Sequence, residues 1–138
     1  MTDEKREDGF SLIEFLLVLV IAGLLATIAV PSFMKSRDVA ERASAVANLH
    51  KLHITQTGYL INNGRYATLP ELNTYAKDKL GTTVGSNILN GDYTFIMIPG
   101  MTSNVDPQYK ILSVKYRNRM AVSAFLIDQR GELRTLID

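Results

Sequence analysis

Apolar side chains are concentrated in a single run near the start of the chain. Residues 1–9 are polar, residues 10–30 are almost entirely apolar, and the rest alternates as an ordinary soluble domain does. At 1.5 Å per residue, a helix over residues 10–30 extends roughly 30 Å, which is the hydrocarbon thickness of a bilayer. Apolar residues surround this helix on every side, so it has no face suited to water. The pattern predicts a transmembrane helix over residues 10–30, joined to one globular part.

Two other interpretations of the apolar run fit the sequence less well. A soluble core helix of this kind would need more chain to cover it than 138 residues easily provide. A cleavable secretory signal has an apolar core of roughly 7–15 residues and small residues at its cleavage site. The run here is longer and ends in V-P-S-F at residues 30–33. Basic residues lie on both sides of the run, so charge does not fix its orientation.

The helical pattern continues beyond Pro31. Apolar positions recur at mostly three- and four-residue spacing over residues 39–60, with polar residues between them. The sequence N-N-G at residues 62–64 is then a stop signal. We expect one long helix from about Ser11 to about Leu60, whose second half is amphipathic and packs on the globular domain.

The remaining sequence predicts a short helix followed by strands. Thr68 and Glu71 have the spacing of a capping box, so a helix is expected from Thr68 to about Lys79. Residues 81–91 are rich in glycine, threonine, serine and asparagine and are interpreted as a loop. D-Q-R-G at residues 128–131 is a tight-turn signal between the last two strands. Four strand patterns are found, at residues 93–98, 109–117, 121–127 and 133–137.

These elements predict an α+β fold. Several short strands without intervening helices favour an antiparallel sheet. We expect a long N-terminal helix, transmembrane in its first half, that packs by its second half on a four-stranded antiparallel sheet. The expected parts are the membrane helix at 10–30, its amphipathic continuation at 31–62, and a globular head at 63–138 in which a loop joins helix and sheet.

Composition and charge exclude several kinds of chemistry. The chain has no cysteine, so it can form neither a disulfide framework nor a thiolate metal site. Its net charge of +1 does not indicate a nucleic-acid partner. His50 and His53 could share a metal, but they lack acidic or thiol partners at suitable spacing and are interpreted as surface or packing residues. No catalytic constellation is recognised, so we predict no enzyme, no cofactor and no metal site.

Two features near the C-terminal end bear on ligand binding. Four arginines there are interpreted as a solvated charged face, with DNA or an anionic surface as the alternative partner. The arginines are Arg117, Arg119, Arg130 and Arg134. The acidic residues Asp128, Glu132 and Asp138 are too loosely spaced for a typical calcium site.

Glu14 interrupts the apolar run. A charged side chain at the centre of a membrane span costs about 2.5–3.5 kcal/mol on insertion scales, and less near an end. Such a residue indicates a function and needs a partner. No lysine, arginine or histidine occurs from residue 10 to residue 34. The cation must therefore come from outside this segment or from a new chain terminus.

The N-terminal segment resembles a known family. Residues 9–33, GFSLIEFLLVLVIAGLLATIAVPSF, resemble the N-terminal signature of type IV pilins and of the related pseudopilins of type II secretion. NGRYATLPEL and FLIDQRGELR look, more loosely, like the loop entry and last hairpin of many short pilins. The elements that agree in both type and spacing are Gly9, Phe10, Ser11-Leu12-Ile13, Glu14, Gly23 and Pro31.

The resemblance implies a processing and assembly pathway. A prepilin peptidase would cut between Gly9 and Phe10 on the cytoplasmic side, release the leader 1–9, and methylate the new amine of Phe10. Subunits would then leave the inner membrane through an assembly platform and motor and stack into a helical fibre. Glu14 would face the Phe10 amine of a neighbouring subunit. The stretch from Gly23 to Pro31 could lose helix on assembly, the alternative being a simple proline kink.

The resemblance leaves three functions open. The first expectation is a type IV pilus subunit, a single-pass membrane precursor that polymerises with identical or related subunits into an extracellular filament for motility, adhesion or DNA uptake. The second is a type II secretion pseudopilin that forms a periplasmic pseudopilus. Major pseudopilins often carry a C-terminal calcium site, and the loose spacing of acidic residues here favours the pilus. A single-span enzyme or sensor with an uncut N-terminus is the third.

Two departures from the family pattern concern its charges and cysteines. The leader is net acidic, with Asp3, Glu4, Glu7 and Asp8 against two basic residues, whereas family leaders are usually basic. Many pilins also close a C-terminal loop with a disulfide, which a chain without cysteine cannot do. From the predicted packing of the sheet on the helix, we also expect the loops at 81–91 and 101–106 and the solvent face of the sheet to form the exterior of the fibre.

Overall fold

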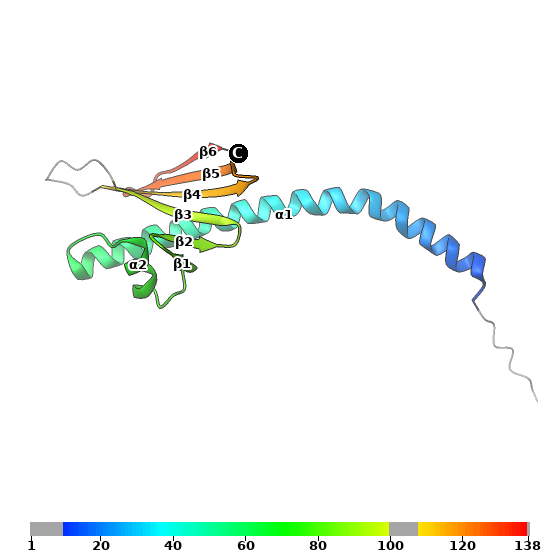
Figure 1. The fold of residues 1–138 in the computed structure, drawn as a ribbon, viewed down its shortest axis with the longest axis horizontal. Helices are drawn as coiled ribbons and strands as arrows, with labels where there is room; N and C mark the ends of the chain where they lie inside the picture. Colours follow the sequence, from blue (N-terminus) through cyan, green and yellow to red (C-terminus); the bar gives the residue numbers. More distant parts are fainter. Residues whose placement is uncertain (1–9, 100–107, 138) are drawn as a thin grey trace, which may run out of the picture. The chain divides into compact units, whose positions relative to one another are not determined.

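The computed structural model describes residues 10–99 and 108–137 (Figure 1). The chain divides into two compact units, Met1–Asp38 and Val39–Asp138. Helix α1, Leu12–Asn63, contributes residues to both units. Its bounds confirm the long helix expected from about Ser11 to about Leu60.

In the first unit, α1 remains helical through Pro31. The proline lacks the N–H that would bond to the carbonyl of Thr27, so one rung of the helix is missing. The segment is long and apolar enough to cross a membrane by length and composition. The leader 1–9 and the expected loop at 101–106 lie outside the described residues.

In the second unit, a short helix follows α1. Helix α2 covers Leu69–Tyr75 and begins with the predicted capping box. The Thr68 hydroxyl accepts a hydrogen bond from the Glu71 N–H, and the Glu71 carboxylate accepts one from the Thr68 N–H at 2.9 Å. Two donors that the helix start would leave unpaired are thereby satisfied.

The expected extension of α2 to about Lys79 is wrong, because Asn73 redirects the chain. Its side chain accepts a hydrogen bond from the Leu80 N–H at 3.1 Å and donates to the Gly81 carbonyl at 2.9 Å. Lys77 and Asp78 adopt positive φ angles of 57° and 56°. The helix therefore closes in a left-handed turn of the kind that terminates helices.

The sheet has six antiparallel strands in the order β1-β2-β3-β4-β5-β6 (Figure 1). The predicted α+β class is confirmed, but with six strands in place of four. The extra pair lies in residues 81–91, which were wrongly expected to form a loop. The strands are β1 Thr82–Val84, β2 Asn87–Asn90, β3 Tyr93–Pro99, β4 Tyr109–Arg117, β5 Met120–Asp128 and β6 Leu133–Ile137.

The glycine- and asparagine-rich segment makes a hairpin because its small and polar residues have specific structural roles. Gly85 has a φ of 60° at the turn between β1 and β2, which few other residues adopt easily. Asn90 donates from its side chain to the Leu80 carbonyl at 2.9 Å. Ile88 of β2 is fully buried against the rest of the core. A buried side chain, a glycine turn and a side-chain hydrogen bond thus help to hold the two added strands in place.

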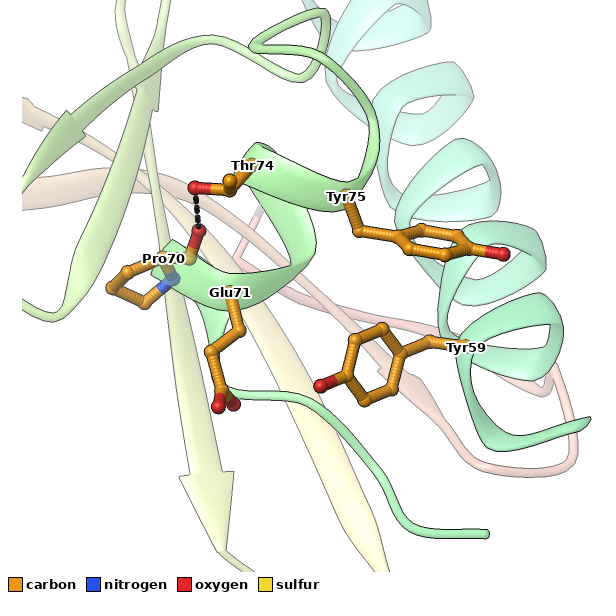
Figure 2. A pocket seen from close by; sticks show the side chains of 5 residues that line it. All are labelled: Tyr59, Pro70, Glu71, Thr74 and Tyr75. Carbon is orange, nitrogen blue, oxygen red and sulfur yellow. Dashed lines mark hydrogen bonds between the residues drawn. The ribbon is translucent and has the colours of Figure 1, made fainter. Parts of the chain in front are cut away.

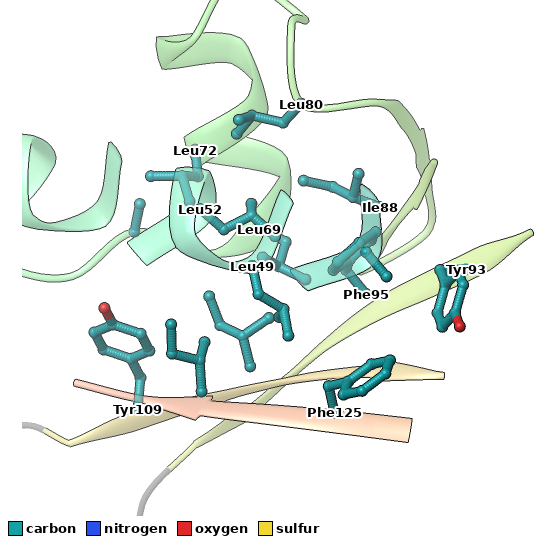
Figure 3. Close-up of a cluster of buried hydrophobic side chains, with 14 residues drawn as sticks. Leu49, Leu52, Leu69, Leu72, Leu80, Ile88, Tyr93, Phe95, Tyr109 and Phe125 are labelled. Atoms are coloured by element: carbon teal, nitrogen blue, oxygen red, sulfur yellow. The ribbon is translucent and has the colours of Figure 1, made fainter. Parts of the chain in front are cut away.

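The core lies between the second half of α1 and one face of the sheet (Figure 3). Leu49 and Leu52 of α1 are buried and belong to one cluster with Phe95, Ile111 and Ile127. The sheet residues are alternate positions of their strands, so they point to the same face. This arrangement confirms that the sheet packs on the second half of the helix.

Polar contacts inside the head fix how the helix meets the loops and the sheet. Gln56 is fully buried, and its side-chain amide bonds to both backbone groups of Ala67, at 2.7 Å and 3.0 Å. Lys115 of β4 donates to the carboxylate of Glu41 on α1 and lies 3.5 Å from Asp92. The hydrogen bond to Glu41 raises the pKa of Lys115, although partial burial opposes the shift.

Replacing Leu49 should destabilise the head. Leu49→Ala removes a side chain with no exposed area, so the cost is expected to be about 2–5 kcal/mol, from lost burial and a cavity. Thermal unfolding of the detergent-solubilised chain, followed by tyrosine circular dichroism, measures it. Ile54→Ala on the same helix is the matched control, because Ile54 is 69% exposed and should change stability by less than roughly 0.5 kcal/mol. Equal effects would contradict the assigned core.

Candidate functional site

The apolar segment of the first unit carries large side chains that are exposed around the whole helix. Each of those between Phe10 and Met34 is at least half exposed, with Phe10 at 75%. A surface of this size and kind is unstable in water, since roughly 25 cal/mol is gained for each Å² of apolar area removed from it. The segment therefore requires lipid or other protein chains around it.

Glu14 lies in the first turn of α1. A carboxylate at this end of a helix is favoured by the helix dipole. Phe10 precedes the helix by two residues, so an amine created at Phe10 would lie within about one turn of this carboxylate. Gly9 lies outside the described residues, and the predicted pairing of Glu14 with a neighbour concerns a second chain.

Gly23 and Pro31 both lie within continuous helix, linked by Thr27. The Thr27 hydroxyl donates to the Gly23 carbonyl at 2.9 Å, and the Thr27 carbonyl is the one that Pro31 leaves without its helical donor. Ser36 makes the equivalent bond to the Ser32 carbonyl at 3.0 Å. Hydroxyl bonds of this kind weaken and bend helices. The hydroxyl bonds of Thr27 and Ser36 were not predicted from the sequence, although a hydroxyl residue four positions after Gly23 was the available signal.

His50 and His53 take different environments in the head. His50 is exposed, whereas His53 is half-buried with its Nδ1 2.8 Å from the Tyr109 hydroxyl. Burial is the main reason that the pKa of Tyr109 is raised well above its ordinary value. Within residues 10–99 and 108–137, no three acidic, histidine or cysteine side chains are grouped as metal ligands. The structure thus gives His53 a packing partner.

The charged residues near the C-terminal end either form hydrogen bonds within the chain or lie far from one another in the sheet. Asp128 accepts hydrogen bonds from the N–H groups of Arg130 and Glu132 at 2.9 Å and 3.0 Å, which closes the predicted turn between β5 and β6. Asp138 lies outside the described residues. Arg117 and Arg119 flank the β4–β5 turn, whereas Arg130 lies at the other end of β5. The four arginines therefore do not form one patch.

A shallow depression of about 480 Å³ lies beside α2 (Figure 2). Tyr59 and Tyr75 meet edge to face with ring centroids 5.3 Å apart. Glu71 at its rim pairs with Arg65 at 2.7 Å. This hydrogen bond, helped by the Thr68 N–H, lowers the pKa of Glu71 from 4.5 to about 2. The acidic group of the depression is thus already paired within the chain, and its aromatic rings hold α1 against α2.

Comparison with known proteins identifies the family of this chain. A family described as the prokaryotic N-terminal methylation motif matches residues 5–30. The type II secretion system core protein G of Klebsiella michiganensis is 30% identical over 116 residues, which are 74% of this chain and 81% of that protein. This chain belongs to the type IV pilin and pseudopilin family. No solved structure matches it.

Two further relatives match over shorter lengths. The core protein G of Dickeya chrysanthemi is 37% identical over 65 residues, or 47% of this chain and 42% of that protein. The type IV major pilin protein PilA of Myxococcus xanthus is 37% identical over 62 residues, or 45% of this chain and 28% of that protein. The chain thus spans less than half the length of these two. Membership of the family confirms the resemblance and implies polymerisation with related subunits, from a precursor that the apolar helix anchors in a membrane.

The stability that the Arg65–Glu71 pair gives to the head should be lost in acid. A carboxyl whose folded pKa is lowered contributes stability above its unfolded value of 4.5, and that contribution is lost as the pH falls to about 2. The difference in melting temperature between wild type and Arg65→Gln is therefore expected to be largest above pH 4.5 and to shrink towards pH 2. Arg134→Gln, whose guanidinium lies 3.6 Å from Glu132, is the control with a looser exposed pair. A difference that stays constant across this range would contradict the assignment.

Proposed function

We propose that this chain is a pseudopilin of a type II secretion system, a structural subunit of a periplasmic pseudopilus. The observation that carries the proposal is the alignment with the Klebsiella core protein G, which extends over 74% of this chain and 81% of its relative. Such an alignment includes far more than the apolar segment that pilins and pseudopilins share. The relatives therefore favour the second of the three expected functions over the first.

The proposed pathway begins with cleavage between Gly9 and Phe10. A prepilin peptidase removes residues 1–9 and methylates the new amine of Phe10. The methylation motif matched at residues 5–30 supports this step. The cut converts a neutral peptide link into a cation at the edge of the apolar segment, which is the charge that residues 10–34 lack.

In the proposed fibre, Glu14 of one subunit neutralises the Phe10 amine of the next. Such a pair in an apolar bundle loses much of its Coulomb energy to desolvation, so its main role is to set the register of neighbouring helices. A subunit displaced by one turn would leave both charges unpaired, at a cost of about 3–5 kcal/mol for each broken pair. The apolar side chains supply the association energy, and the charges select one alignment.

Assembly would also require a change in the helix and the action of other proteins. We propose that the helix is weakest from Gly23 to Pro31, where a hydrogen bond is missing and the Thr27 hydroxyl bonds back to the Gly23 carbonyl. Local unwinding there would adjust the length of the segment as it leaves the bilayer. An inner-membrane platform and motor are the proposed partners for this extraction.

A type IV pilus subunit is the second candidate function. The observation that favours it is the 37% identity to the Myxococcus major pilin. Processing, membrane insertion and Glu14 pairing would be the same in both cases. The two functions differ in where the fibre ends, inside the periplasm or outside the cell.

Deletion of the gene should separate the two candidates. Loss of a pseudopilin is expected to leave exported enzymes in the periplasm while surface filaments persist. Enzyme assays on culture medium and periplasm, with electron microscopy of the cells, measure both. Complementation with the wild-type gene is the control. Normal secretion together with missing filaments would refute the pseudopilin function and support the pilus.

Glu14→Ala should give subunits that are processed but assemble poorly. The substitution leaves the cleavage site intact and removes the charge that pairs with the neighbouring amine, so polymer yield is expected to fall at least tenfold. Mass spectrometry of the N-terminus measures processing, and sedimentation of polymer measures assembly. The matched variant Gly9→Val should instead retain the leader 1–9, so that neither processing nor assembly takes place. Normal polymer from Glu14→Ala would overturn the role of this carboxylate.

A further inference from the structure

The turn between β4 and β5 is an exposed tip of mixed basic and apolar composition. Arg117 pairs with Met120 across the two strands, so Asn118 and Arg119 are the two residues of the turn itself. Tyr116 and Met120 are 54% and 70% exposed, and the residues between them are exposed as well. We call these five residues the hairpin tip. It presents two large apolar side chains and two cations within one short stretch of chain.

The backbone of the turn indicates that Arg119 does not serve the fold. Asn118 and Arg119 have φ angles of 51° and 66°. A two-residue turn in which both φ angles are positive is of type I′, and glycine is preferred at its second position. Asparagine tolerates this left-handed region, whereas the Cβ of arginine is disfavoured there. Strained backbone positions of this kind are typical of functional sites. The hairpin tip thus carries a cation where the turn alone would favour glycine.

The two arginines of the hairpin tip are not neutralised by the acidic groups near them. Glu41 and Asp92 lie close to this end of the head, but both face Lys115, which donates a hydrogen bond to Glu41 and lies 3.5 Å from Asp92. In the parts of the chain that the structure describes, neither Arg117 nor Arg119 takes part in an ion pair. Their guanidinium groups can therefore bind an external anion, and phosphate oxygens match the guanidinium geometry.

The hairpin tip lies at the end of the second unit where the chain enters that unit. At the start of β4, the Tyr109 hydroxyl is 2.8 Å from Nδ1 of His53. Near the end of β4, Lys115 is paired with Glu41, which comes much earlier in α1. Strand β4 therefore runs antiparallel to this part of α1, and its end leads back towards Val39, the first residue of the unit. The β4–β5 turn lies at this end of the sheet (Figure 1).

The length of chain between the apolar segment and the head keeps this end close to the bilayer. The segment that anchors the precursor ends at residue 30, and the second unit begins at Val39. Even fully extended, the residues between them reach only roughly 30 Å. A surface held this near to lipid meets headgroups at a high effective concentration, so contacts that are weak one by one are sufficient to hold it there.

We infer that the hairpin tip binds the anionic phospholipid surface of the membrane that anchors the precursor. Arg117 and Arg119 contact the lipid phosphates. The ring of Tyr116 lies at the level of the headgroups, where tyrosine is enriched, and the flexible side chain of Met120 enters the apolar edge of the bilayer. Each basic residue near an anionic surface raises the occupancy of the bound state roughly fivefold, so the two arginines together contribute roughly 25-fold.

This contact belongs to the precursor and ends when the subunit leaves the bilayer. The inference rests on the membrane anchor and not on the kind of fibre, because a pseudopilin and a pilin both begin as anchored precursors. It gives the head a preferred orientation on the membrane before assembly, since only one end of the head carries the hairpin tip.

Tryptophan fluorescence tests the contact directly, because the natural chain has no tryptophan. The full-length Met120→Trp chain is placed in lipid nanodiscs that contain brominated phosphatidylcholine, with or without phosphatidylglycerol. We expect the bromines to quench the fluorescence in the discs with anionic lipid. The quenching should be mostly lost in discs of phosphatidylcholine alone and at high salt, which screens charged contacts. Absence of quenching in the anionic discs would overturn the inference.

Matched charge variants test the role of the two arginines. In the Met120→Trp chain, Arg117→Gln with Arg119→Gly should lower the ratio of bound to free heads roughly 25-fold. Arg130→Gln with Arg134→Gln removes the same charge towards the opposite end of β5 and should leave the quenching unchanged. Arg119→Gly also relieves the left-handed strain, so the melting temperature should not fall and unfolding is excluded as the cause of the loss. Quenching that survives the first pair, or is lost equally with the second, contradicts the assignment.

Two further reporters separate failure of this contact from failure of the membrane anchor. Leu19→Trp lies in the apolar segment and should be quenched in every disc, whereas Ile61→Trp, at the far end of α1 and 77% exposed in the natural chain, should not be. Quenching at Leu19→Trp but not at Met120→Trp refutes the lipid contact and leaves the proposed function standing. Loss of quenching at Leu19→Trp refutes the anchor on which both depend.

Two other outcomes would assign the hairpin tip differently. Equal quenching at Ile61→Trp and Met120→Trp would mean that the head lies on lipid without a preferred end, which overturns the inference. Protein cross-links from Met120→Cys in cells, together with an unquenched Met120→Trp in anionic discs, would assign the tip to a protein partner. The chain has no other cysteine, so such cross-links report this position alone.

Discussion

The seam between α1 and the sheet is the interaction on which the rest of the head depends. Leu49 and Leu52 lie one turn apart and fill the space above Phe95, Ile111 and Ile127. A single helix cannot bury such residues alone, and a sheet of short strands needs a cover on at least one face. Helix α2 and the β1–β2 hairpin add to this seam through Leu72 and Ile88, both fully buried. The head is therefore organised around the helix that also anchors it.

The elements that form the contact between α1 and the sheet were predictable from the sequence, whereas the features that depend on single side chains were not. The predicted bounds of strands β4 and β6 agree with the structure. The β1–β2 hairpin was not predicted, because only Ile88 marks it as buried and its glycines and asparagines are typical of loops as well. Helix α2 was predicted too long because the Asn73 side chain, rather than the helical pattern, ends it.

The candidate site was predictable only as far as it lies in one chain. Glu14 stands out because a carboxylate in an apolar segment is costly and has no cation within residues 10–34. Its partner, in the proposed assembly, depends on a peptide bond being cut and on a second molecule, and neither is encoded by spacing within the segment. The bond from Thr27 to Gly23 is local, but many helical threonines make it, so it predicts a bend less well than Pro31 does.

An ordered polymer needs both association energy and a defined alignment of its subunits. A purely apolar helix can slide or rotate against its neighbours with little change in buried area, because the hydrophobic effect is non-directional. The proposed Glu14 pair would remove that freedom along the fibre axis, since a wrong register leaves charges unpaired. It would not fix the rotation of the heads. Contacts between neighbouring heads would have to fix it, because closely packed surfaces fit well only in particular orientations. A charge near the N-terminus and the contacts between heads would then control two different degrees of freedom.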